Sequence, residues 1–377
     1  MRDISEIRND IDKIDRELLN LFKERLSLAN DVAEFKMENR RPIFDRKREE
    51  EKLASLLKDE KDDFTKQGLS EFFSELMAIN RKKQYKILAE NGMMGPLNFK
   101  PIKAFDFSGK TAVFQGVPGA YSQEAALRFF GESVRIYPVD TWRNAMDAIR
   151  TGMADYAVLP IENSSAGIVS ENYDLLTEFD VSIIGEQIIP INHCLLGLPG
   201  TDKSMIKTVY SHPQALMQCD DYLRTGITGV KTVALQNTAA AARKVMEDKD
   251  ETQAAIAGSI NEKLYGLSIL DERIQDDKSN ETRFIVVSGE KLYLESAKNI
   301  SLSFRLSNDK GTLYHTLSHF IFNGLSMSRI ESRPIPGKVW EYRFFIDLEG
   351  NLMDENVQNA LRGLQEETLN LRILGNY

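Results

Sequence analysis

The sequence lacks the features of a disulfide-rich, metal-binding or membrane-embedded protein. Its 377 residues include only two cysteines, Cys194 and Cys219, too few for a disulfide framework or a paired-cysteine zinc site. The four histidines are scattered, and only His315 and His319 share a helical spacing, so we expect no metal site. No apolar run approaches the roughly 20 residues of a membrane span, and the charged start lacks the apolar stretch of a secretory signal. We therefore expect a cytoplasmic protein.

Positive charge is also scarce. Lys and Arg number 48 against 57 Asp and Glu, which gives a formal net charge of −9. This balance disfavours non-specific binding to nucleic acid or to anionic membranes. Any anionic ligand must therefore be held by local cations. The length predicts two or three domains with cores of their own.

The composition changes sharply near residue 90. Residues 1–90 contain 20 Lys and Arg and 21 Asp and Glu, but only one of the 23 glycines and one of the 11 prolines. Glycine, asparagine and proline then cluster at residues 91–96, as expected of a linker. We expect a helical domain over residues 1–90, a linker over 91–107, and further domains over 108–289 and 299–377.

Apolar residues recur with a helical period through the first segment. The pattern predicts one long helix, interrupted at Pro42, then a second helix over about 45–58 and a third from near Thr65. Three helices this thin cannot bury their apolar faces alone, so we expect the segment to dimerise. The stripe on the first helix consists of Ile4, Ile7, Ile11, Ile14, Leu18, Leu21, Leu28, Val32 and Phe35.

Two cations share one face of the predicted long helix. Arg25 takes a stripe position, where an unpaired guanidinium would be unfavourable, so it needs an anionic partner. Lys36 lies three turns further along the same face, whereas Arg8 points about 100° away and could serve a neighbouring chain. Internal pairs of Arg25 with Glu49 and of Lys36 with Asp45 would also satisfy these charges. Spacing alone favours such a network, because ligand sites are few.

The order and spacing of these residues and their neighbours resemble the active site of the all-helical chorismate mutases over essentially all of residues 1–90. The resemblance implies rearrangement of chorismate to prephenate without a cofactor, by holding a compact conformer and stabilising charge on the breaking ether. The matching residues are Arg8, Arg25, Lys36, Asp45, Arg48, Glu49, Asn80 and Gln84, with the turn 41–43.

The resemblance also implies individual roles. Arg25, together with Arg8 of the partner subunit, would bind the two substrate carboxylates, with Arg48 nearby. Lys36 and Gln84 would face the ether oxygen. Asp45 and Glu49 would bind the ring hydroxyl and orient the neighbouring cations. Asn80 would keep a hydrogen bond.

The middle segment alternates short β-branched runs with helical stretches, which predicts an α/β fold. The expected strands are 111–115, 154–159, 181–189, 206–210, 230–234, 254–257 and 284–287. Small polar residues follow several of them. Such junctions can bind a carboxylate at a helix N-terminus, although each alone is an ordinary helix cap. The junctions are 116–122, 162–167, 211–214 and 236–238.

Four motifs in this segment resemble prephenate dehydratase in the right order: 116–122, 159–164, 211–214 with Gln218, and 280–284. The resemblance implies two α/β lobes, similar to type II periplasmic binding proteins, with the site between them. The reaction needs a proton donor at the leaving hydroxyl, a role that the family gives to Thr282. We rank His212 below Thr282, because a histidine before a proline at a helix start often serves the turn. Residues expected to bind the substrate are Tyr121, Ser122, Glu162, Asn163, Ser164, Ser211, Gln218, Asn237, Thr238, Arg283 and Phe284.

The last segment reads as strand, helix, strand, strand, helix, strand, the ferredoxin-like order. It resembles an ACT regulatory domain, which implies phenylalanine binding at the interface of paired domains. A domain that only dimerises is the alternative. The residues expected to bind the effector are Gly311, Thr312, Leu313, Glu331, Ser332, Arg333 and Pro334.

Together the three segments resemble the bifunctional chorismate mutase/prephenate dehydratases of phenylalanine biosynthesis. The resemblance implies a multidomain, feedback-inhibited enzyme that forms a homodimer or higher oligomer. Two alternatives remain at this point. The helical segment of a monofunctional prephenate dehydratase could be only a dimerisation arm, or the chain could be a non-catalytic amino-acid-binding sensor.

Overall fold

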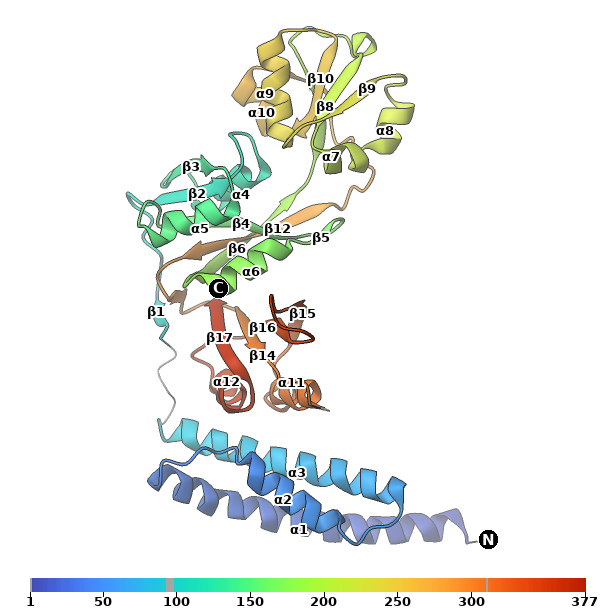
Figure 1. The fold of residues 1–377 in the computed structure, drawn as a ribbon, viewed down its shortest axis with the longest axis vertical. Helices are drawn as coiled ribbons and strands as arrows, with labels where there is room; N and C mark the ends of the chain where they lie inside the picture. The colour runs from blue at the N-terminus through green and yellow to red at the C-terminus, as the bar shows by residue number, and fades with distance from the viewer. Residues whose placement is uncertain (1, 93–97, 310) are drawn as a thin grey trace. The chain divides into compact units, whose positions relative to one another are not determined.

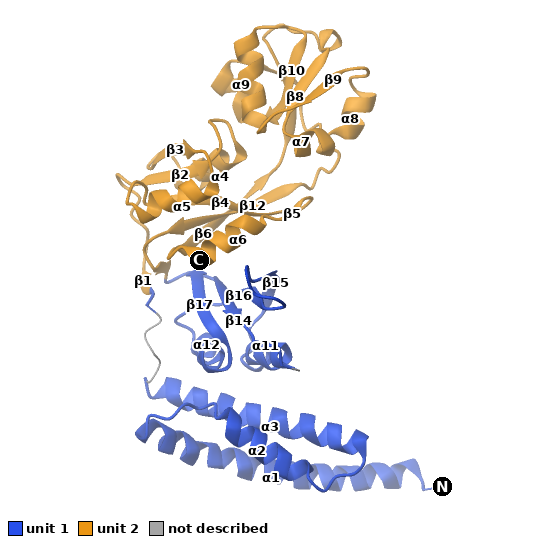
Figure 2. Cartoon of the chain, in the orientation of Figure 1, with its two compact units in different colours: residues 1–99, 295–376 blue, residues 100–294, 377 orange. Residues whose placement is uncertain are grey.

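The computed structural model describes residues 2–92, 98–309 and 311–377. The chain forms two compact units, one made of residues 1–99 with 295–376 and the other of residues 100–294 with 377 (Figure 2). The first unit therefore joins the helical segment to the C-terminal segment across almost two hundred residues of intervening chain. Part of the linker expected at 91–107, residues 93–97, lies outside the described residues.

Three helices form the N-terminal part of the first unit: α1 (Ile4–Glu38), α2 (Arg46–Leu57) and α3 (Asp63–Glu90). Each begins at an aspartate cap whose carboxylate accepts a backbone N–H: Asp3 from Ser5, Asp45 from Arg48 and Asp62 from Thr65. The break before Pro42 and the three predicted helices are confirmed. Asp45, however, caps the second helix and precedes it, whereas we expected the helix to begin at about this residue.

The predicted apolar stripe of α1 is exposed in the single chain. Ile14 and Leu21 are 57% and 62% exposed, and the residues of α1 that are buried are Ala29 and Ala33. Small side chains let α1 approach α3 closely, where Ala33 packs in a cluster with Ile43, Tyr85 and Leu88. The stripe thus faces away from the rest of its own unit. The first turns of α1 also extend past α3 (Figure 1).

The C-terminal part of the first unit has the predicted ferredoxin-like order. Its strands pair antiparallel in the sequence β15-β16-β14-β17. Helices α11 and α12 lie between this sheet and α3 (Figure 1). The elements are β14 (Asn299–Arg305), α11 (Thr312–Phe322), β15 (Met327–Pro334), β16 (Tyr342–Glu349), α12 (Glu355–Glu367) and β17 (Leu369–Asn376).

The second unit contains two lobes, each built on its own sheet. In the first lobe the strands follow the order β3-β2-β4-β12-β6, with β5 beside β4. Strand β2 runs parallel to β3 and β4, and β12 runs antiparallel to β4 and β6. Its elements are β2 (Thr111–Gln115), α4 (Tyr121–Phe130), β3 (Arg135–Val139), α5 (Trp142–Arg150), β4 (Tyr156–Asn163), β5 (Gly167–Ile168), α6 (Ser170–Glu178), β6 (Ser182–Pro190) and β12 (Glu281–Ser288).

The second lobe has the strand order β11-β7-β10-β8-β9, with an apolar cluster on each face of the sheet. The chain enters this lobe after β6 and returns to the first lobe at β12. Its elements are β7 (His193–Gly197), a 3₁₀ turn (Lys203–Met205), β8 (Thr208–Ser211), α7 (Pro213–Gln218), α8 (Asp220–Thr225), β9 (Lys231–Ala234), α9 (Thr238–Asp248), β10 (Gln253–Gly258), α10 (Ile260–Tyr265) and β11 (Ser268–Asp271).

All seven predicted strands are present, but others were missed. Strand β3 contains Pro138, which breaks the apolar alternation yet is tolerated because β3 lies at the end of the sheet order. Strand β7 is short, entirely buried and begins with a histidine. Short strands β1 (Lys100–Ile102) and β13 (Leu292–Leu294) pair with each other. None of the described helices has the length and apolar character needed to cross a membrane.

Candidate active sites

A pocket of about 320 Å³ opens among the three N-terminal helices. Its walls come from α1, from the turn before α2, from α2 and from α3. Seven of the eight residues expected for the mutase-like site line it, although they lie up to 59 positions apart in the chain. They are Arg25, Lys36, Asp45, Arg48, Glu49, Asn80 and Gln84.

The two cations of α1 are held by carbonyl oxygens. Arg25 Nη1 donates to Leu76 O at 3.2 Å, and Lys36 Nζ donates to Ile43 O at 2.5 Å. Within the described chain neither cation forms an ion pair with Glu49 or Asp45, so the internal network favoured by spacing alone is wrong. Burial lowers the pKa of both groups, and nearby carboxylates offset this only in part. Two partly buried cations without a carboxylate in contact suit an anionic ligand.

The polar residues of α3 are fixed by their own helix. Asn80 Nδ2 donates to Leu76 O at 2.8 Å, and Gln84 Nε2 donates to Asn80 O at 3.3 Å. Gln84 Oε1 is buried and has no hydrogen-bond partner among the residues that the structure describes. A buried polar atom without a partner is costly, which is expected where a ligand completes the hydrogen bonding.

Arg8 does not reach this pocket. It lies in the first turns of α1, where its side chain is exposed. The pocket lining on α1 begins at Arg25, more than four helical turns away. Arg8 is therefore the one of the eight expected residues that does not line this pocket.

Two cations of the pocket were missed by sequence reasoning, Lys52 and Arg81. Lys52 follows Arg48 by one helical turn. Arg81 is spaced four residues from Met77 and from Tyr85, both buried, so the helical period already placed it on the inner face. Because Arg81 is charged, however, we did not expect it to be buried on that face.

Thr282 and Asn163 lie opposite each other on the adjacent strands β12 and β4. Asn163 Oδ1 accepts from the backbone N–H groups of Ser165 and Ala166, which fixes the orientation of the amide. Its Nδ2 then donates to Thr282 Oγ1 at 2.9 Å and to Asn280 Oδ1 at 2.7 Å. Since Thr282 Oγ1 accepts here, its own O–H is left to donate elsewhere. This is the geometry that a proton donor needs.

A second cluster of predicted residues surrounds His193, which sequence reasoning passed over. His193 Nδ1 lies 3.0 Å from Tyr121 Oη, and Nε2 lies 3.1 Å from Gln218 Oε1. Burial lowers the pKa of His193, against a smaller effect of Gln218, so the ring is neutral at pH 7. Tyr121 belongs to the first lobe, whereas His193 and Gln218 belong to the second, so the cluster ties the lobes together. The sequence around His193 contains no motif that predicts this contact between the lobes.

Other predicted residues have structural contacts. Asn237 caps α9 by accepting from Ala240 N at 2.7 Å, and Thr238 is the first residue of that helix. Ser211 is fully buried and donates to Ile256 O. His212 caps α7, as its place before a proline suggested. Ser122 lies in the first turn of α4, and Ser164 Oγ accepts from Glu281 N.

The two residues after Thr282 are not brought together with it. Successive side chains on a strand point to opposite faces, and Arg283 forms an ion pair with Glu186 at 2.7 Å. Glu162 lies opposite Arg283 in the strand register. Phe284 is buried in the apolar core of the first lobe. Arg283 and Phe284 therefore have contacts of their own, and their expected part in substrate binding stays a prediction.

The residues expected to bind an effector lie on two elements. Gly311 precedes α11 with φ = +78°, a conformation that favours glycine, and Thr312 and Leu313 open the helix. Strand β15, at the end of the sheet order, carries the second motif. Along it Glu331 and Arg333 are half-buried, whereas Ser332 and Pro334 are exposed.

Comparison with known proteins agrees with this geometry. Chorismate mutase type II matches residues 7–85, and prephenate dehydratase matches residues 112–292. A bifunctional chorismate mutase/prephenate dehydratase of Aquifex aeolicus is 33% identical over 100% of this chain and 98% of its own. Arogenate dehydratase 3 of Arabidopsis thaliana is 38% identical over 75% of this chain and 70% of its own. A prephenate dehydratase of Arthrobacter aurescens, solved with L-Phe, covers 71% of this chain and 89% of its own with a TM-score of 0.66 and 33% identity.

The fold and the two matches define a multidomain enzyme with an all-helical mutase domain and a two-lobed α/β dehydratase domain. Because the similarity to the Aquifex protein runs the full length of both chains, the chain belongs to the bifunctional chorismate mutase/prephenate dehydratase family.

Proposed function

We propose that this chain converts chorismate to prephenate in the helical pocket and prephenate to phenylpyruvate at Thr282, under feedback inhibition by phenylalanine. The observation that carries the proposal is the convergence of seven expected residues on one pocket, with Arg25 and Lys36 partly buried and free of carboxylate contacts. In this proposal residues 1–90, 108–289 and 299–377 are the mutase, dehydratase and regulatory domains.

The mutase step would need only binding and electrostatics. Arg25 binds one substrate carboxylate and the partner subunit's Arg8 the other, so that chorismate is held in its compact conformer. Lys36 stabilises the negative charge that develops on the ether oxygen. Lys36 Nζ now contacts a carbonyl oxygen that cannot neutralise its charge, which leaves the ammonium able to turn to the substrate. Glu49 accepts from the ring hydroxyl.

The dehydratase step would couple loss of carbon dioxide to loss of water. The electron pair of the departing carboxylate enters the ring and expels the ring hydroxyl, which leaves as water once protonated. Thr282 supplies that proton, since Asn163 holds its oxygen and leaves its O–H directed elsewhere. Tyr121, Ser122, Gln218 and the neutral His193 would bind the rest of the substrate.

We also propose that the chain works as a homodimer or a higher oligomer. The exposed stripe of α1 supports this, because an apolar face of that length is rarely left to solvent. A second copy that packs along this stripe would bring its Arg8 to the mutase pocket of the first copy. Arg8 of the same chain does not line that pocket.

Feedback inhibition would act through the C-terminal domain. Gly311 and the edge strand β15 support it, since an open strand edge and a glycine with positive φ are where paired domains could enclose an amino acid. A prephenate dehydratase of Arthrobacter aurescens, which covers 71% of this chain at 33% identity, was solved with L-Phe, and this supports phenylalanine as the effector.

The test is a coupled time course on the purified full chain, following loss of chorismate and appearance of phenylpyruvate with and without phenylalanine. We expect phenylpyruvate to appear and phenylalanine to suppress it. Chorismate left intact while added prephenate is consumed would reduce residues 1–90 to a dimerisation arm. Turnover of neither compound, with phenylalanine still bound, would make the chain a sensor.

A further inference from the structure

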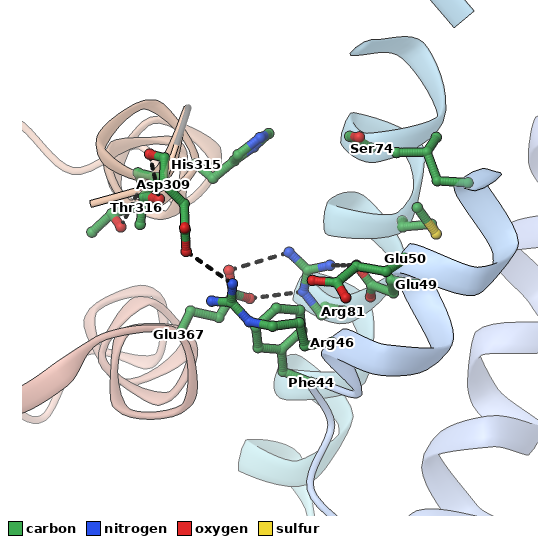
Figure 3. A pocket seen from close by; sticks show the side chains of 13 residues that line it. Phe44, Arg46, Glu49, Glu50, Ser74, Arg81, Asp309, His315, Thr316 and Glu367 are labelled. Atoms are coloured by element: carbon green, nitrogen blue, oxygen red, sulfur yellow. Dashed lines mark hydrogen bonds and ion pairs between the residues drawn. The ribbon is translucent and has the colours of Figure 1, made fainter. Parts of the chain in front are cut away.

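The mutase pocket shares wall residues with a second pocket that the C-terminal domain borders. A second pocket of about 230 Å³ lies beside the first, within the same compact unit (Figure 3). Phe44, Glu49 and Arg81 border it from the N-terminal helices, and Thr312 and Glu367 border it from the C-terminal domain. Glu49 and Arg81 line both pockets. A side chain of α12 can therefore act on the mutase site through a single intervening residue.

That intervening residue is Arg81. Its Nη1 donates to Glu49 Oε2 at 2.5 Å, while Nε and Nη2 donate to the two carboxylate oxygens of Glu367 at 2.8 and 3.2 Å. The side chains of Arg81 and Glu367 are each 7% exposed. A bidentate pair with a planar guanidinium fixes its orientation as well as its position. Glu367 thus determines which way the remaining N–H groups of Arg81 point, and they point at Glu49 (Figure 3).

The charges at this contact stay ionised. Burial alone would raise the pKa of Glu367, but the neighbouring His319 and Arg81 outweigh it and hold the pKa at about 2. Tyr85 Oη adds a hydrogen bond to the same carboxylate at 3.3 Å. The Arg81 guanidinium also lies over the ring of Phe44, 4.6 Å from its centre. The arrangement leaves Arg81 little freedom while Glu367 is charged.

The preceding residue of α12 reaches the same part of the mutase domain. Glu366 Oε2 accepts from Phe44 N at 2.9 Å. Phe44 stands between Ile43, whose carbonyl oxygen holds Lys36 Nζ, and Asp45, which caps α2. The last turn of α12 therefore contacts both the turn and the arginine that position the polar groups of the pocket.

We propose that Glu367 is a positioning residue of the mutase, which holds Arg81 so that Arg81 in turn fixes Glu49 at the substrate. The inference rests on the proposed function, since it takes Glu49 to contact chorismate. It makes the C-terminal domain a structural part of the mutase site. Glu367 itself touches no substrate.

The test replaces Glu367 by glutamine in the full chain. Gln keeps the size of the side chain and removes the charge, so Arg81 loses its bidentate partner. We expect mutase kcat/KM to fall between about tenfold and a hundredfold, the range for a group displaced from its productive geometry. Dehydratase activity, measured on the same preparation, should stay within about twofold and serves as the control for folding.

A second substitution separates charge from packing. Glu367→Asp keeps the charge but shortens the side chain, and we expect it to retain more mutase activity than Glu367→Gln. A purely structural role would give the opposite order, because Gln fills the same space. The matched control is Glu355→Gln, which removes the exposed ion pair of Glu355 with Lys86, between the same helices α12 and α3 but outside both pockets. It should leave the mutase unchanged.

A double-mutant cycle completes the test. If Glu367 acts through Arg81, the variant Arg81→Met with Glu367→Gln should lose no more activity than Arg81→Met alone. Additive losses, or an unchanged Glu367→Gln enzyme, would overturn the inference. Absence of mutase activity in the unsubstituted chain would instead mean that the proposed function is wrong.

Discussion

The helical pocket and the Thr282 cluster differ in the groups that they would offer to an anionic substrate. The pocket gathers five cations, Arg25, Lys36, Arg48, Lys52 and Arg81, from three helices. The cluster consists of a hydroxyl and two amides on neighbouring strands and the loop before them, joined by hydrogen bonds of 2.7 to 2.9 Å. Charge that develops in the transition state suits the first arrangement, and a proton delivered to a leaving group suits the second. Each site therefore reflects the reaction proposed for it.

The two sites also differ in their supports. Thr282 and Asn163 belong to adjacent strands whose neighbours form a buried core. The pocket lies in a thin layer of three helices whose longest helix exposes an apolar stripe. We therefore expect the helical site to depend on contacts beyond its own domain, and the strand site to be self-sufficient.

The largest expected effect is on the mutase alone. Arg25→Ala should lower mutase kcat/KM about 10³-fold, equivalent to about 4 kcal/mol, because truncating one partner of a buried charge pair costs several kcal/mol. Dehydratase activity should be unchanged. Arg16→Ala removes an exposed arginine of the same helix and should affect neither activity. Equal loss of both activities in folded Arg25→Ala would end the distinction between two separate sites.

The reverse variant tests the strand site. Thr282→Ala should lower dehydratase kcat by about 10²-fold to 10³-fold, the usual contribution of a positioned proton donor, while the mutase is unaffected. Thr282→Ser keeps the hydroxyl and should recover most of the activity. Thr232→Ala, at an exposed strand position, is the control. A fully active Thr282→Ala enzyme would remove this residue from the chemistry.

A smaller effect should follow from disturbing the stripe. Ile14→Glu places a charge in the middle of it and should weaken association, so that mutase activity at low protein concentration falls about tenfold as the partner's Arg8 is lost. Sedimentation would show the lower mass. Met153→Glu, at a residue 70% exposed in the other unit, should change neither mass nor activity. An Ile14→Glu protein of unaltered mass would show that the stripe is not the interface.

The smallest effect concerns pH. Burial lowers the pKa of Lys36 from its ordinary 10.5, so mutase kcat/KM should fall as pH rises through a value below 10.5, where the ammonium loses its proton. Lys36→Arg stays protonated and should move this alkaline limb upward, whatever its overall activity. Lys23→Arg on the exposed side of the same helix should leave the profile as it is. An alkaline limb common to all three proteins would assign it to another group.

Local chemistry made much of the fold predictable. Aspartates before the second and third helices, a proline after the first, and β-branched runs flanked by glycine act over a few residues, so one sequence displays them. Asp45 follows the same rule, and although we expected it within the second helix, its place directly before a helical run could have identified it as a cap. The strands that were missed lack such signals, because tertiary burial alone makes β7 a strand.

Contacts between distant residues were not predictable in this way. Arg81 and Glu367 lie 286 positions apart, and each looks like an ordinary charged residue on a helix surface. Likewise the contact of His193 with Tyr121 joins two lobes and residues 72 positions apart. The mutase residues were identified through their resemblance to a known pattern, whereas the spacing by itself favoured an ion-pair network that the structure does not contain.

The two cysteines give the second lobe an intrinsic reporter. Cys194 lies in β7 and Cys219 between α7 and α8, and their side chains are 3% and 0% exposed. Burial raises the pKa of both thiols, that of Cys219 to about 12, so neither reacts while the lobe is closed. A thiol reagent can therefore label the native chain only through opening of this lobe, and the labelling rate measures how often it opens. Substrate that holds Tyr121, His193 and Gln218 together should slow that labelling, which would report binding without any turnover.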